Sequence, residues 1–382
     1  MTTTTRRRGD ARAEADRRLM SRALELAARG IGFVSPSPLV GCVIAADDGR
    51  VVGEGFYLYD GLKHAEALAL EQAGPLARGA TAYVTLEPHA HQSRTPPCTD
   101  ALIRAGVRRV VYSVDDPNSL VAGNGLRQLR AAGVEVEVGL MALEAALLNE
   151  KYLHAVREGR PFVHLKLACS LDGRIQTHAR DSCRMTGPEA RTAVHELRHE
   201  YDAVLVGAGT AEKDDPALKD RSGRRRRRPL VRVVLGKTLR LSPTSRLART
   251  AREAPVLVFT AEVDGERADA LRRLGVEIVR AECGGRNLAG VLEELCHRSL
   301  QSVLVEGGGT VAGAFRDAGL IDKVSFFIAP RIIGGREAVP SVGGFGADCM
   351  ARAVDIVNAE VRLRGRDVEV TGYPEAAQAG RG

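Results

Sequence analysis

The chain has 382 residues, of which 44% are hydrophobic, 27% are charged and 4% are aromatic, and its formal charge is +7. At about 100–200 residues per domain, this length predicts two domains. No apolar run reaches the roughly 18–20 residues of a membrane-spanning helix, and the N-terminal arginines are not followed by the apolar segment of an export signal. We therefore expect a cytoplasmic protein without membrane contact.

The positive charge is concentrated in two short segments. Residues 1–18 contain six Arg and three acids, and residues 221–228 contain six Arg and no acid, which leaves −2 for the remainder. Residues 1–15 and 374–382 are predicted to be disordered tails, and the arginine run to be a solvated loop. Seven scattered cysteines in a chain of this size indicate reduced thiols. The body of the chain therefore does not have the charge of a nucleic-acid-binding protein.

The first half alternates helices and strands. The apolar spacing predicts a helix over 16–29, a β-hairpin over 40–46 and 51–57, helices over 64–72, 98–105 and 126–132, strands over 81–86, 109–114 and 134–138, and a helical stretch over 139–160. Repeated strand-then-helix units imply a mainly parallel sheet in three layers. We assign residues 16–158 to this first domain.

The pattern restarts after residue 160. It predicts strands over 162–168, 203–206, 231–235, 256–260, 277–279, 302–306 and 323–328, with helices over 187–200, 267–274, 288–298 and 311–318. No internal repeat relates the two halves. Residues 161–373 are therefore predicted to form a second, different α/β domain.

A zinc motif is visible in the first half. His64-Ala65-Glu66 opens a predicted helix, and His89, His91 and Cys98 lie in TLEPHAHQSRTPPC at 85–98. Zinc nucleobase deaminases hold the metal with a His and two thiolates, while a Glu that does not bind the metal moves protons. His64 and Glu66 can face one metal only in the first helical turn, because a regular helix places them about 200° apart. A Glu at a helix start is also favoured by the helix dipole alone.

A glycine-rich segment follows the strand at 302–306. Gly307-Gly308-Gly309-Thr310 leads into a helix, which is typical either of a tight turn or of a phosphate cradle at a helix N-terminus. The spacing is not GxGxxG, so a Rossmann fold is not indicated.

Several collinear motifs resemble the bifunctional deaminase/reductase family of riboflavin biosynthesis. They are SPSPLVGCVI, GEGFYLYDGLKHAE, TLEPHAHQSRTPPCTDALIRAG and DDPNSLVAGNGLRQLRAAGVEV, then RPFVHLKLACSLDGRI, MTGPEAR, AVLVGAGTAEKDDPAL, VEGGGTVAGAF and IAPRIIGG. The resemblance spans roughly residues 16–372. It implies a cytidine-deaminase-like three-layer domain followed by a dihydrofolate-reductase-like α/β domain.

The implied activity is two consecutive steps on one small molecule. A zinc site would hydrolytically deaminate 2,5-diamino-6-ribosylamino-4(3H)-pyrimidinone 5′-phosphate, and the second domain would then reduce the ribosyl group to ribityl with NADPH. The implied partners are this pyrimidine ribose phosphate and, by the same resemblance, a second copy in a homodimer.

The resemblance implies His64, His89 and Cys98 as zinc ligands and Glu66 as the catalytic acid/base. The family has Cys where this chain has His89. Either His89 replaces that ligand, giving a site with two imidazoles and one thiolate, or it is a decayed ligand and His91 is a second candidate. Ser37 and Tyr57 also depart from the family pattern around the substrate, while Arg94 keeps its place.

The resemblance also implies residues of the reductase site. The expected NADPH contacts are Ala168, Arg184, Thr210, Asp214, Gly308, Gly309, Thr310, Val311, Ala312, Gly313 and Ala314, and the expected substrate contacts are Ser182, Arg198, Leu218, Arg221 and Glu306. We assign Asp214 a catalytic role beside the hydride donor, with a turn cap before Pro216 as the alternative. The alternatives are a helix-surface ion pair with Glu200 or Asp202 for Arg198, and a structural role for Glu306. Arg184 and Lys237 stand where the family has other residues.

Three hypotheses differ in class. The leading one is the bifunctional enzyme. The second keeps only the reductase, with a degenerate first domain, and rests on His89, Ser37 and Tyr57. The third is an RNA-editing deaminase, which the arginine segments suggest, but stacking aromatics are absent from the sequence around 221–228.

Overall fold

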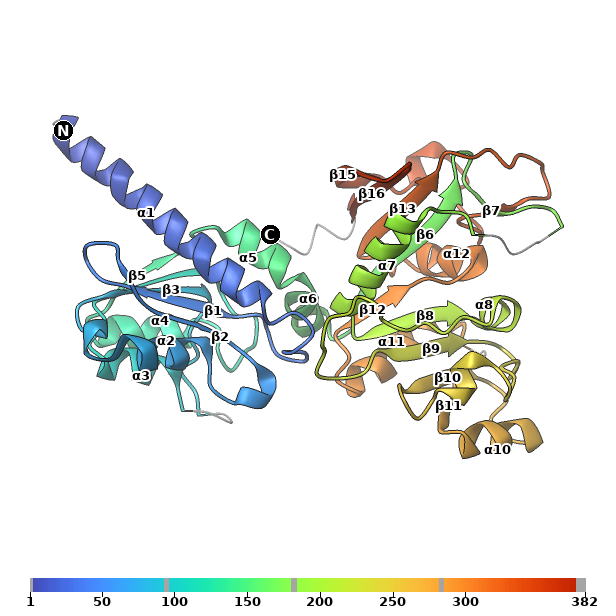
Figure 1. Ribbon diagram of the computed structural model, residues 1–382, viewed down its shortest axis with the longest axis horizontal. Helices are drawn as coiled ribbons and strands as arrows, with labels where there is room; N and C mark the ends of the chain where they lie inside the picture. Colours follow the sequence, from blue (N-terminus) through green and yellow to red (C-terminus); the bar gives the residue numbers. More distant parts are fainter. Residues whose placement is uncertain (1–2, 93–95, 180–183, 282–284, 376–382) are drawn as a thin grey trace. The chain divides into compact units, whose positions relative to one another are not determined.

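The computed structural model describes residues 3–92, 96–179, 184–281 and 285–375. The chain divides into two compact units, Met1–Gly159 and Arg160–Gly382, which are described separately below (Figure 1). Among the described residues, every helix is too short or too polar to cross a lipid bilayer.

A five-stranded sheet with the order β2-β1-β3-β4-β5 forms the centre of the first unit. β1 pairs antiparallel with β2, which confirms the predicted hairpin, and antiparallel with β3. β3, β4 and β5 are parallel to one another. The strands are β1 (Gly41–Ala45), β2 (Val51–Phe56), β3 (Thr81–Leu86), β4 (Arg109–Val114) and β5 (Glu135–Val138).

Helices cover both faces of this sheet (Figure 1). Along β1, Cys42 and Ile44 pack against one helical layer, and Val43 and Ala45 pack against the other, because successive strand residues point to opposite faces. The predicted three-layer arrangement is therefore confirmed. The first layer contains α2 (Ala65–Ala73), α3 (Cys98–Arg104) and α4 (Asn124–Ala131), the second contains α1 (Thr3–Ala28) and α5 (Ala142–Leu148), and α6 (Glu150–Glu158) follows.

The start of α1 corrects the predicted disordered tail over 1–15. The helix begins at Thr3 and is continuous with the predicted one. Alanine and arginine are good helix formers, and the next turns of α1 are fixed to the sheet. Asp16 accepts hydrogen bonds from Arg109 at 2.7 Å and from the hydroxyl of Tyr83 at 2.5 Å. Composition alone did not reveal these partners.

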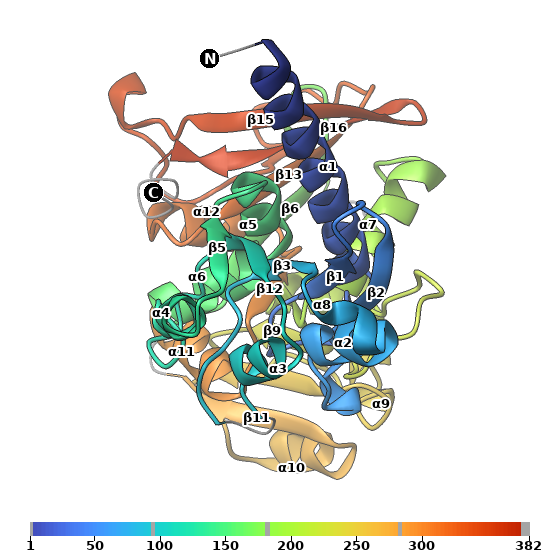
Figure 2. The same ribbon diagram turned by 90° about the vertical axis from the view of Figure 1, so that its left-hand side faces the viewer.

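A nine-stranded sheet with the order β11-β10-β9-β8-β12-β6-β13-β16-β15 forms the centre of the second unit (Figure 1). Its end with β13, β16 and β15 is visible in Figure 2. The first seven strands of this order are parallel, whereas β16 and β15 are antiparallel to their neighbours. The strands are β6 (Phe162–Ser170), β8 (Ala203–Gly207), β9 (Val231–Leu235), β10 (Val256–Thr260), β11 (Val276–Arg280), β12 (Ser302–Val305), β13 (Lys323–Ala329), β15 (Ile356–Arg364) and β16 (Asp367–Pro374).

Two helical layers enclose the parallel part of this sheet. One face packs against α11 (Leu288–His297) and α12 (Gly309–Asp317). The other packs against α7 (Pro188–Glu200), α8 (Ala208–Asp214), α9 (Arg246–Arg249) and α10 (Glu266–Arg273). A separate two-stranded sheet pairs β7 (Arg174–Gln176) with β14 (Val339–Pro340).

The second unit differs from the sequence prediction in several elements. α8 was not predicted from the sequence. β15 and β16 were not predicted, and neither were β7, β14 and α9. The sequence alternates polar and apolar residues over 360–364, but β15 is exposed over most of its length, so this alternation does not correspond to a half-buried strand.

The arginine run is only partly a solvated loop. Arg224 and Arg225 are exposed. Arg226, however, donates hydrogen bonds to the carbonyl oxygens of Arg198 and Tyr201, and Arg228 donates to the carbonyl oxygen of Ser299. The end of the run therefore caps backbone oxygens of its own unit.

Candidate functional site

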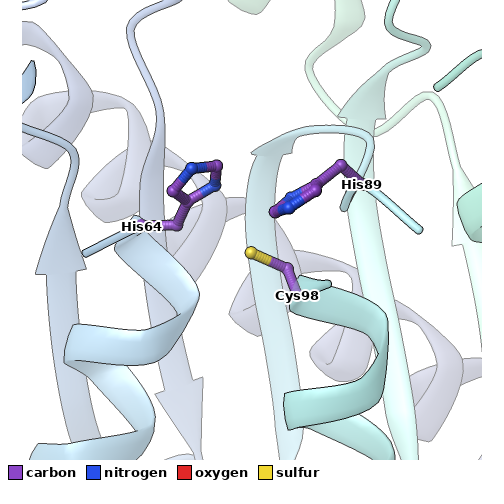
Figure 3. Close-up of side chains that lie close together, drawn as sticks. All are labelled: His64, His89 and Cys98. Atoms are coloured by element: carbon purple, nitrogen blue, oxygen red, sulfur yellow. The ribbon is translucent and has the colours of Figure 1, made fainter. Parts of the chain in front are cut away.

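Three predicted ligands meet beside the five-stranded sheet (Figure 3). His64 precedes α2 with an extended backbone (φ −72°, ψ 161°), His89 follows β3, and Cys98 is the first residue of α3. One ligand atom from each residue lies within 4.8 Å of the other two. The ring centroids of His64 and His89 are 4.5 Å apart, and all three side chains point toward one another. This arrangement suits a small cation held by two imidazoles and a thiolate.

The position of Glu66 depends on where α2 begins. The helix starts at Ala65, so His64 lies outside it and Glu66 lies in its first turn. Glu66 is only 3% exposed. His64 and Glu66 can therefore face the same centre, as the sequence required.

Glycines in β2 fix the start of α2. A Cβ on Gly55 would lie 2.2 Å from the carbonyl oxygen of Ala65, and one on Gly53 would lie 2.0 Å from that of Ala69. Only glycine permits this approach of helix backbone to strand. Substitution there would push α2 outward and move both His64 and Glu66.

Unsatisfied buried atoms test whether a cation fits. Among the described residues, His89 Nε2 and Glu66 Oε2 are buried without a hydrogen-bond partner, an arrangement that costs free energy unless a ligand supplies the missing interaction. Burial, together with the neighbouring His64 and His91, lowers the pKa of His89 to about 4, so its imidazole is in the neutral form that binds metals. Burial and Glu66 raise the pKa of the Cys98 thiol, and a divalent cation would reverse that effect. The residues therefore fit zinc.

His91 and Tyr57 lie beside the cluster. The His91 ring is 5.3 Å from the His89 ring, and the group of residues within ligand distance contains His89 and not His91. Tyr57 is buried and places its ring edge-on to His64 at 5.1 Å. Arg94 lies outside the described residues.

Two buried carboxylates near this centre were missed by the sequence analysis. Glu87 accepts the backbone N–H groups of Gly123, Gly125 and Leu126 at the start of α4. Asp116 accepts a hydrogen bond of 3.0 Å from the hydroxyl of Tyr152. Both hold the loop between β4 and α4, and no local pattern could have revealed contacts this far apart in sequence.

In the second unit, Glu306 lies between two cations. Arg198 on α7 donates two hydrogen bonds to its carboxylate, of 2.6 and 2.9 Å, and Lys166 Nζ on β6 lies 3.6 Å from Oε2. Burial alone would raise the pKa of Glu306, but Arg198 and Lys166 lower it to about 2. Burial lowers the pKa of Lys166. Arg198 thus belongs to a buried network rather than to a helix-surface ion pair, and Lys166 is a residue that the sequence analysis missed.

His195 adds a further group to this network. Burial lowers its pKa, and so do Arg198 and Arg221, while Glu306 acts in the opposite direction. Three of the predicted substrate positions therefore affect the charge of one imidazole. Within the described chain, its Nδ1 is buried and has no hydrogen-bond partner.

The glycine-rich segment, which is predicted to bind NADPH, has a packing role. A Cβ on Gly309 would lie 2.4 Å from the carbonyl oxygen of Pro340, and one on Gly313 would lie 2.2 Å from the backbone of Gly343. These two glycines allow the backbone of residues 340–344 to lie against α12. Gly308 instead donates its N–H to Thr210 Oγ1 at 3.3 Å, which joins α8 to the start of α12.

Three of the predicted NADPH positions lie toward the carboxyl ends of three neighbouring strands. Ala168 lies on β6, Thr210 follows β8 and Gly308 follows β12, and these three strands are neighbours. Ligands of open parallel sheets bind beyond the carboxyl ends of the strands. Of the other residues in this set, Thr310, Ala314, Arg184 and Asp214 are exposed, Val311 is half-buried, and Ala312 and Gly313 are buried.

Three predicted substrate positions remain, Leu218, Ser182 and Arg221. Leu218 is 4% exposed and packs in the apolar core, so a contact there would come from its main chain. Ser182 lies outside the described residues. Arg221 is exposed.

Comparison with known proteins gives consistent matches over nearly the whole chain. A family model of the RibD C-terminal domain matches residues 161–371, and one of the cytidine and deoxycytidylate deaminase zinc-binding region matches residues 13–114. Riboflavin biosynthesis protein RibD of Bacillus amyloliquefaciens is 39% identical over 94% of this chain and 97% of its own length. The protein of the same name from Escherichia coli (strain K12) is 40% identical over 92% of this chain and 98% of its own length.

Solved structures agree with these relatives. Acinetobacter baumannii RibD, form 1, superposes with a TM-score of 0.85 at 38% identity, covering 95% of this chain and 99% of the other. The diaminohydroxyphosphoribosylaminopyrimidine deaminase/5-amino-6-(5-phosphoribosylamino)uracil reductase of Thermotoga maritima superposes with a TM-score of 0.84 at 38% identity, with the same coverage.

Proposed function

The chain belongs to the RibD family of riboflavin-biosynthesis deaminase/reductases, and we propose that it performs both reactions of that family on one pyrimidine ribose phosphate. The first unit removes the 2-amino group of 2,5-diamino-6-ribosylamino-4(3H)-pyrimidinone 5′-phosphate as ammonia. The second unit reduces the ribosyl group to ribityl with NADPH. The cluster of His64, His89 and Cys98 around buried Glu66 is the observation that carries the deaminase half.

In the deaminase, each residue has a separate task. His64, His89 and Cys98 would hold zinc, which supplies a water molecule whose pKa is lowered to about 7. Glu66 would take one proton from the attacking water and give it to the ring nitrogen, and it would then take the second proton from the new hydroxyl and give it to the amino group that leaves as ammonia. Its burial keeps the carboxylate close to the reacting atoms, and its free Oε2 is available for the proton.

His89 in place of a thiolate changes the charge of the site. With two neutral imidazoles and one thiolate, the donor set carries one negative charge. A second thiolate would add another, so this set should bind zinc less tightly and acidify the water more strongly. Because His89 nevertheless lies within ligand distance of His64 and Cys98, we interpret it as a functional ligand.

In the reductase, bound NADPH would supply a hydride to C1′ of the sugar. C1′ can accept this hydride only when the C1′–O4′ bond opens, and that opening requires a proton at O4′. Lys166 Nζ, held by Glu306, is a buried donor beside the predicted substrate positions. Arg198 fixes Glu306 from the other side. Arg221 can pair with the substrate phosphate, and Asp214 borders the nicotinamide at the end of α8.

One assay separates the two activities. The diaminopyrimidine phosphate is incubated with and without NADPH, and ammonia and NADPH oxidation are followed separately, with zinc measured in the purified protein. We expect ammonia in both incubations, NADPH oxidation only after deamination, and about one zinc per chain. Zinc below about a tenth of an atom per chain without ammonia release would leave only the reductase. A His89→Cys variant that alone releases ammonia would identify His89 as a decayed ligand.

We further propose that the chain acts in the cytoplasm, without RNA. Arg226 and Arg228 are engaged by their own unit, which argues against an RNA-binding arginine run. Replacing Arg224 and Arg225 with Ala should leave both small-molecule rates unchanged. RNA-dependent activity would overturn this assignment.

A further inference from the structure

The loop 217–222, between α8 and β9, carries two of the predicted substrate positions (Figure 1). Leu218 is buried and has a left-handed backbone with φ of +46°, a conformation that a bulky residue keeps only where its surroundings hold it. Arg221 lies three residues later and is exposed. The contacts that fix this irregular backbone therefore also determine where Arg221 lies.

Two arginines of the second unit hold the first part of the loop. Arg232 on β9 is 0% exposed and donates a hydrogen bond of 3.3 Å to the carbonyl oxygen of Ala217. Arg198 on α7 donates one of 3.1 Å to the carbonyl oxygen of Lys219. Because Arg198 also donates to the carboxylate of Glu306, the loop is joined to the buried network at the end of β12.

The carboxylate of Asp220 holds the second part of the loop to α7. His199 Nδ1 lies 3.0 Å from Asp220 Oδ2, and a guanidinium nitrogen of Arg226 lies 3.7 Å from the same oxygen. The other oxygen, Oδ1, accepts the backbone N–H of Ser222 at 2.9 Å. The side chains of His199 and Asp220 are 2% and 10% exposed, so water screens their contact little. Both oxygens of Asp220 are thus engaged by groups other than Arg221.

This arrangement presents Arg221 on a fixed turn. The bond from Ser222 N–H to the Asp220 side chain closes an Asx turn with Arg221 at its centre. In the part of the chain that the structure describes, Arg221 forms no ion pair. An exposed guanidinium offers parallel N–H donors to a phosphate group. On a fixed turn it also loses less conformational freedom on binding than it would on a mobile loop.

We propose that the His199–Asp220 pair positions Arg221 for the phosphate group of the reductase substrate. The pair thereby sets how strongly the second unit prefers a phosphorylated over an unphosphorylated ribosylaminopyrimidine. His199 and Asp220 are positioning residues, because they act through Arg221 and do not contact the reacting atoms. The inference rests on the proposed reduction of the pyrimidine ribose phosphate and adds to it the residues that determine phosphate recognition.

Steady-state kinetics of the full chain test this role. Wild type without NADPH first converts the diaminopyrimidine phosphate to the deaminated compound, and a phosphatase then removes the phosphate from part of it. Asp220→Ala should raise the KM for the phosphorylated compound about tenfold, because Arg221 must then be ordered on binding. The kcat and the KM for NADPH should stay within about twofold of wild type. The kcat/KM for the unphosphorylated compound should not change.

Two further variants complete the comparison. His199→Ala removes the same contact from the side of α7 and should raise the KM for the phosphorylated compound by the same factor as Asp220→Ala. Glu253→Ala is the matched control, because Glu253 forms an ion pair of 2.5 Å with Lys219 in the same loop but has a side chain that is 63% exposed. It should leave every kinetic constant at the wild-type value.

A double-mutant cycle separates positioning from a general loss of structure. Arg221→Ala removes the phosphate contact itself, so Asp220→Ala/Arg221→Ala should have the same KM as Arg221→Ala alone. Additive effects, a wild-type KM in both Asp220→Ala and His199→Ala, or an equal loss with the unphosphorylated compound would overturn the inference and leave the proposed function intact. A wild type that oxidises no NADPH with either compound would refute the proposed reductase function, and this inference with it.

Discussion

Replacing Glu306 with Gln should destabilise the second unit strongly. The variant removes the negative charge that Arg198 and Lys166 share. Folding lowers the pKa of the Glu306 carboxyl from 4.5 to about 2, which corresponds to a stabilisation of about 3 kcal/mol near neutral pH. The side chain is only 7% exposed, so solvent screens the interaction little. Breaking a buried ion pair costs about 3–5 kcal/mol, which agrees with this estimate.

The pH dependence of this effect has a definite sign. The pKa of Glu306 is lower in the folded than in the unfolded chain, so its contribution is complete above the unfolded value of 4.5 and is lost as pH falls toward 2. The difference between wild type and Glu306→Gln should therefore be constant from about pH 5.5 to 8 and shrink below pH 4.5.

The assay must report on one unit at a time, because a chain with two domains need not unfold in one step. The chain has no Trp, so we suggest hydrogen exchange by mass spectrometry in increasing urea. Peptides from β6 and β12 then report the second unit, and peptides from β3 and β4 are the internal reference. NADPH oxidation should fall in the variant while ammonia release is retained.

Glu277→Gln is the matched control. Glu277, like Glu306, accepts two hydrogen bonds from one arginine: Arg298 donates them at 2.9 and 2.6 Å. The Glu277 side chain, however, is 52% exposed. An exposed pair of this kind contributes about 0.2–1 kcal/mol. If Glu306→Gln lowers the free energy of unfolding of the second unit by no more than Glu277→Gln does, burial does not strengthen the network, and the reasoning from the Glu306 pKa is wrong.

Three further variants, two of them with a matched control variant, test the remaining assignments. Glu66→Gln should lower the rate of ammonia release by about 10²–10⁴-fold, while zinc measured by atomic absorption stays at the wild-type level. Gly313→Ala places a Cβ 2.2 Å from a neighbouring backbone carbon and should cost about 1–3 kcal/mol. Gly209→Ala, in open space on α8, should be neutral or stabilising by up to about 1 kcal/mol in the same thermal unfolding experiment. Asp16→Asn should destabilise the first unit by about 3 kcal/mol in urea unfolding. Glu54 is less buried than Asp16, so the control Glu54→Gln should cost no more than about 1 kcal/mol in the same experiment.

Much of the fold could be predicted from local pattern. The bounds predicted for β3, β4, β9 and β10 agree with those of the structure, because these strands are buried runs of β-branched and apolar residues. β15 could not be predicted in the same way, since both its faces are exposed and its neighbour β16 is specified only by the completed sheet. The helical start of the chain was missed because charge was interpreted as disorder.

The two sites differ in how far their chemistry could be inferred from residue types. Imidazole, thiolate and carboxylate have few roles when they occur together, so His64, His89, Cys98 and Glu66 could be grouped before any geometry was known. Glycine and arginine have many roles. The glycine-rich segment was interpreted as a phosphate cradle, yet Gly309 and Gly313 are also required by packing against residues 340–344.

The Lys166–Glu306–Arg198 network shows why sequence order limits such inference. Its members lie on β6, on α7 and at the end of β12. They meet because β12 pairs with β6 in the sheet, although β12 follows β6 in the sequence by more than 130 residues. A lysine inside an apolar strand pattern looks like an interruption until the partner carboxylate is known. An unpaired buried charge would cost folding free energy. A lysine in a predicted central strand therefore indicates that an acidic partner lies at the end of a neighbouring strand, and with it a polar site.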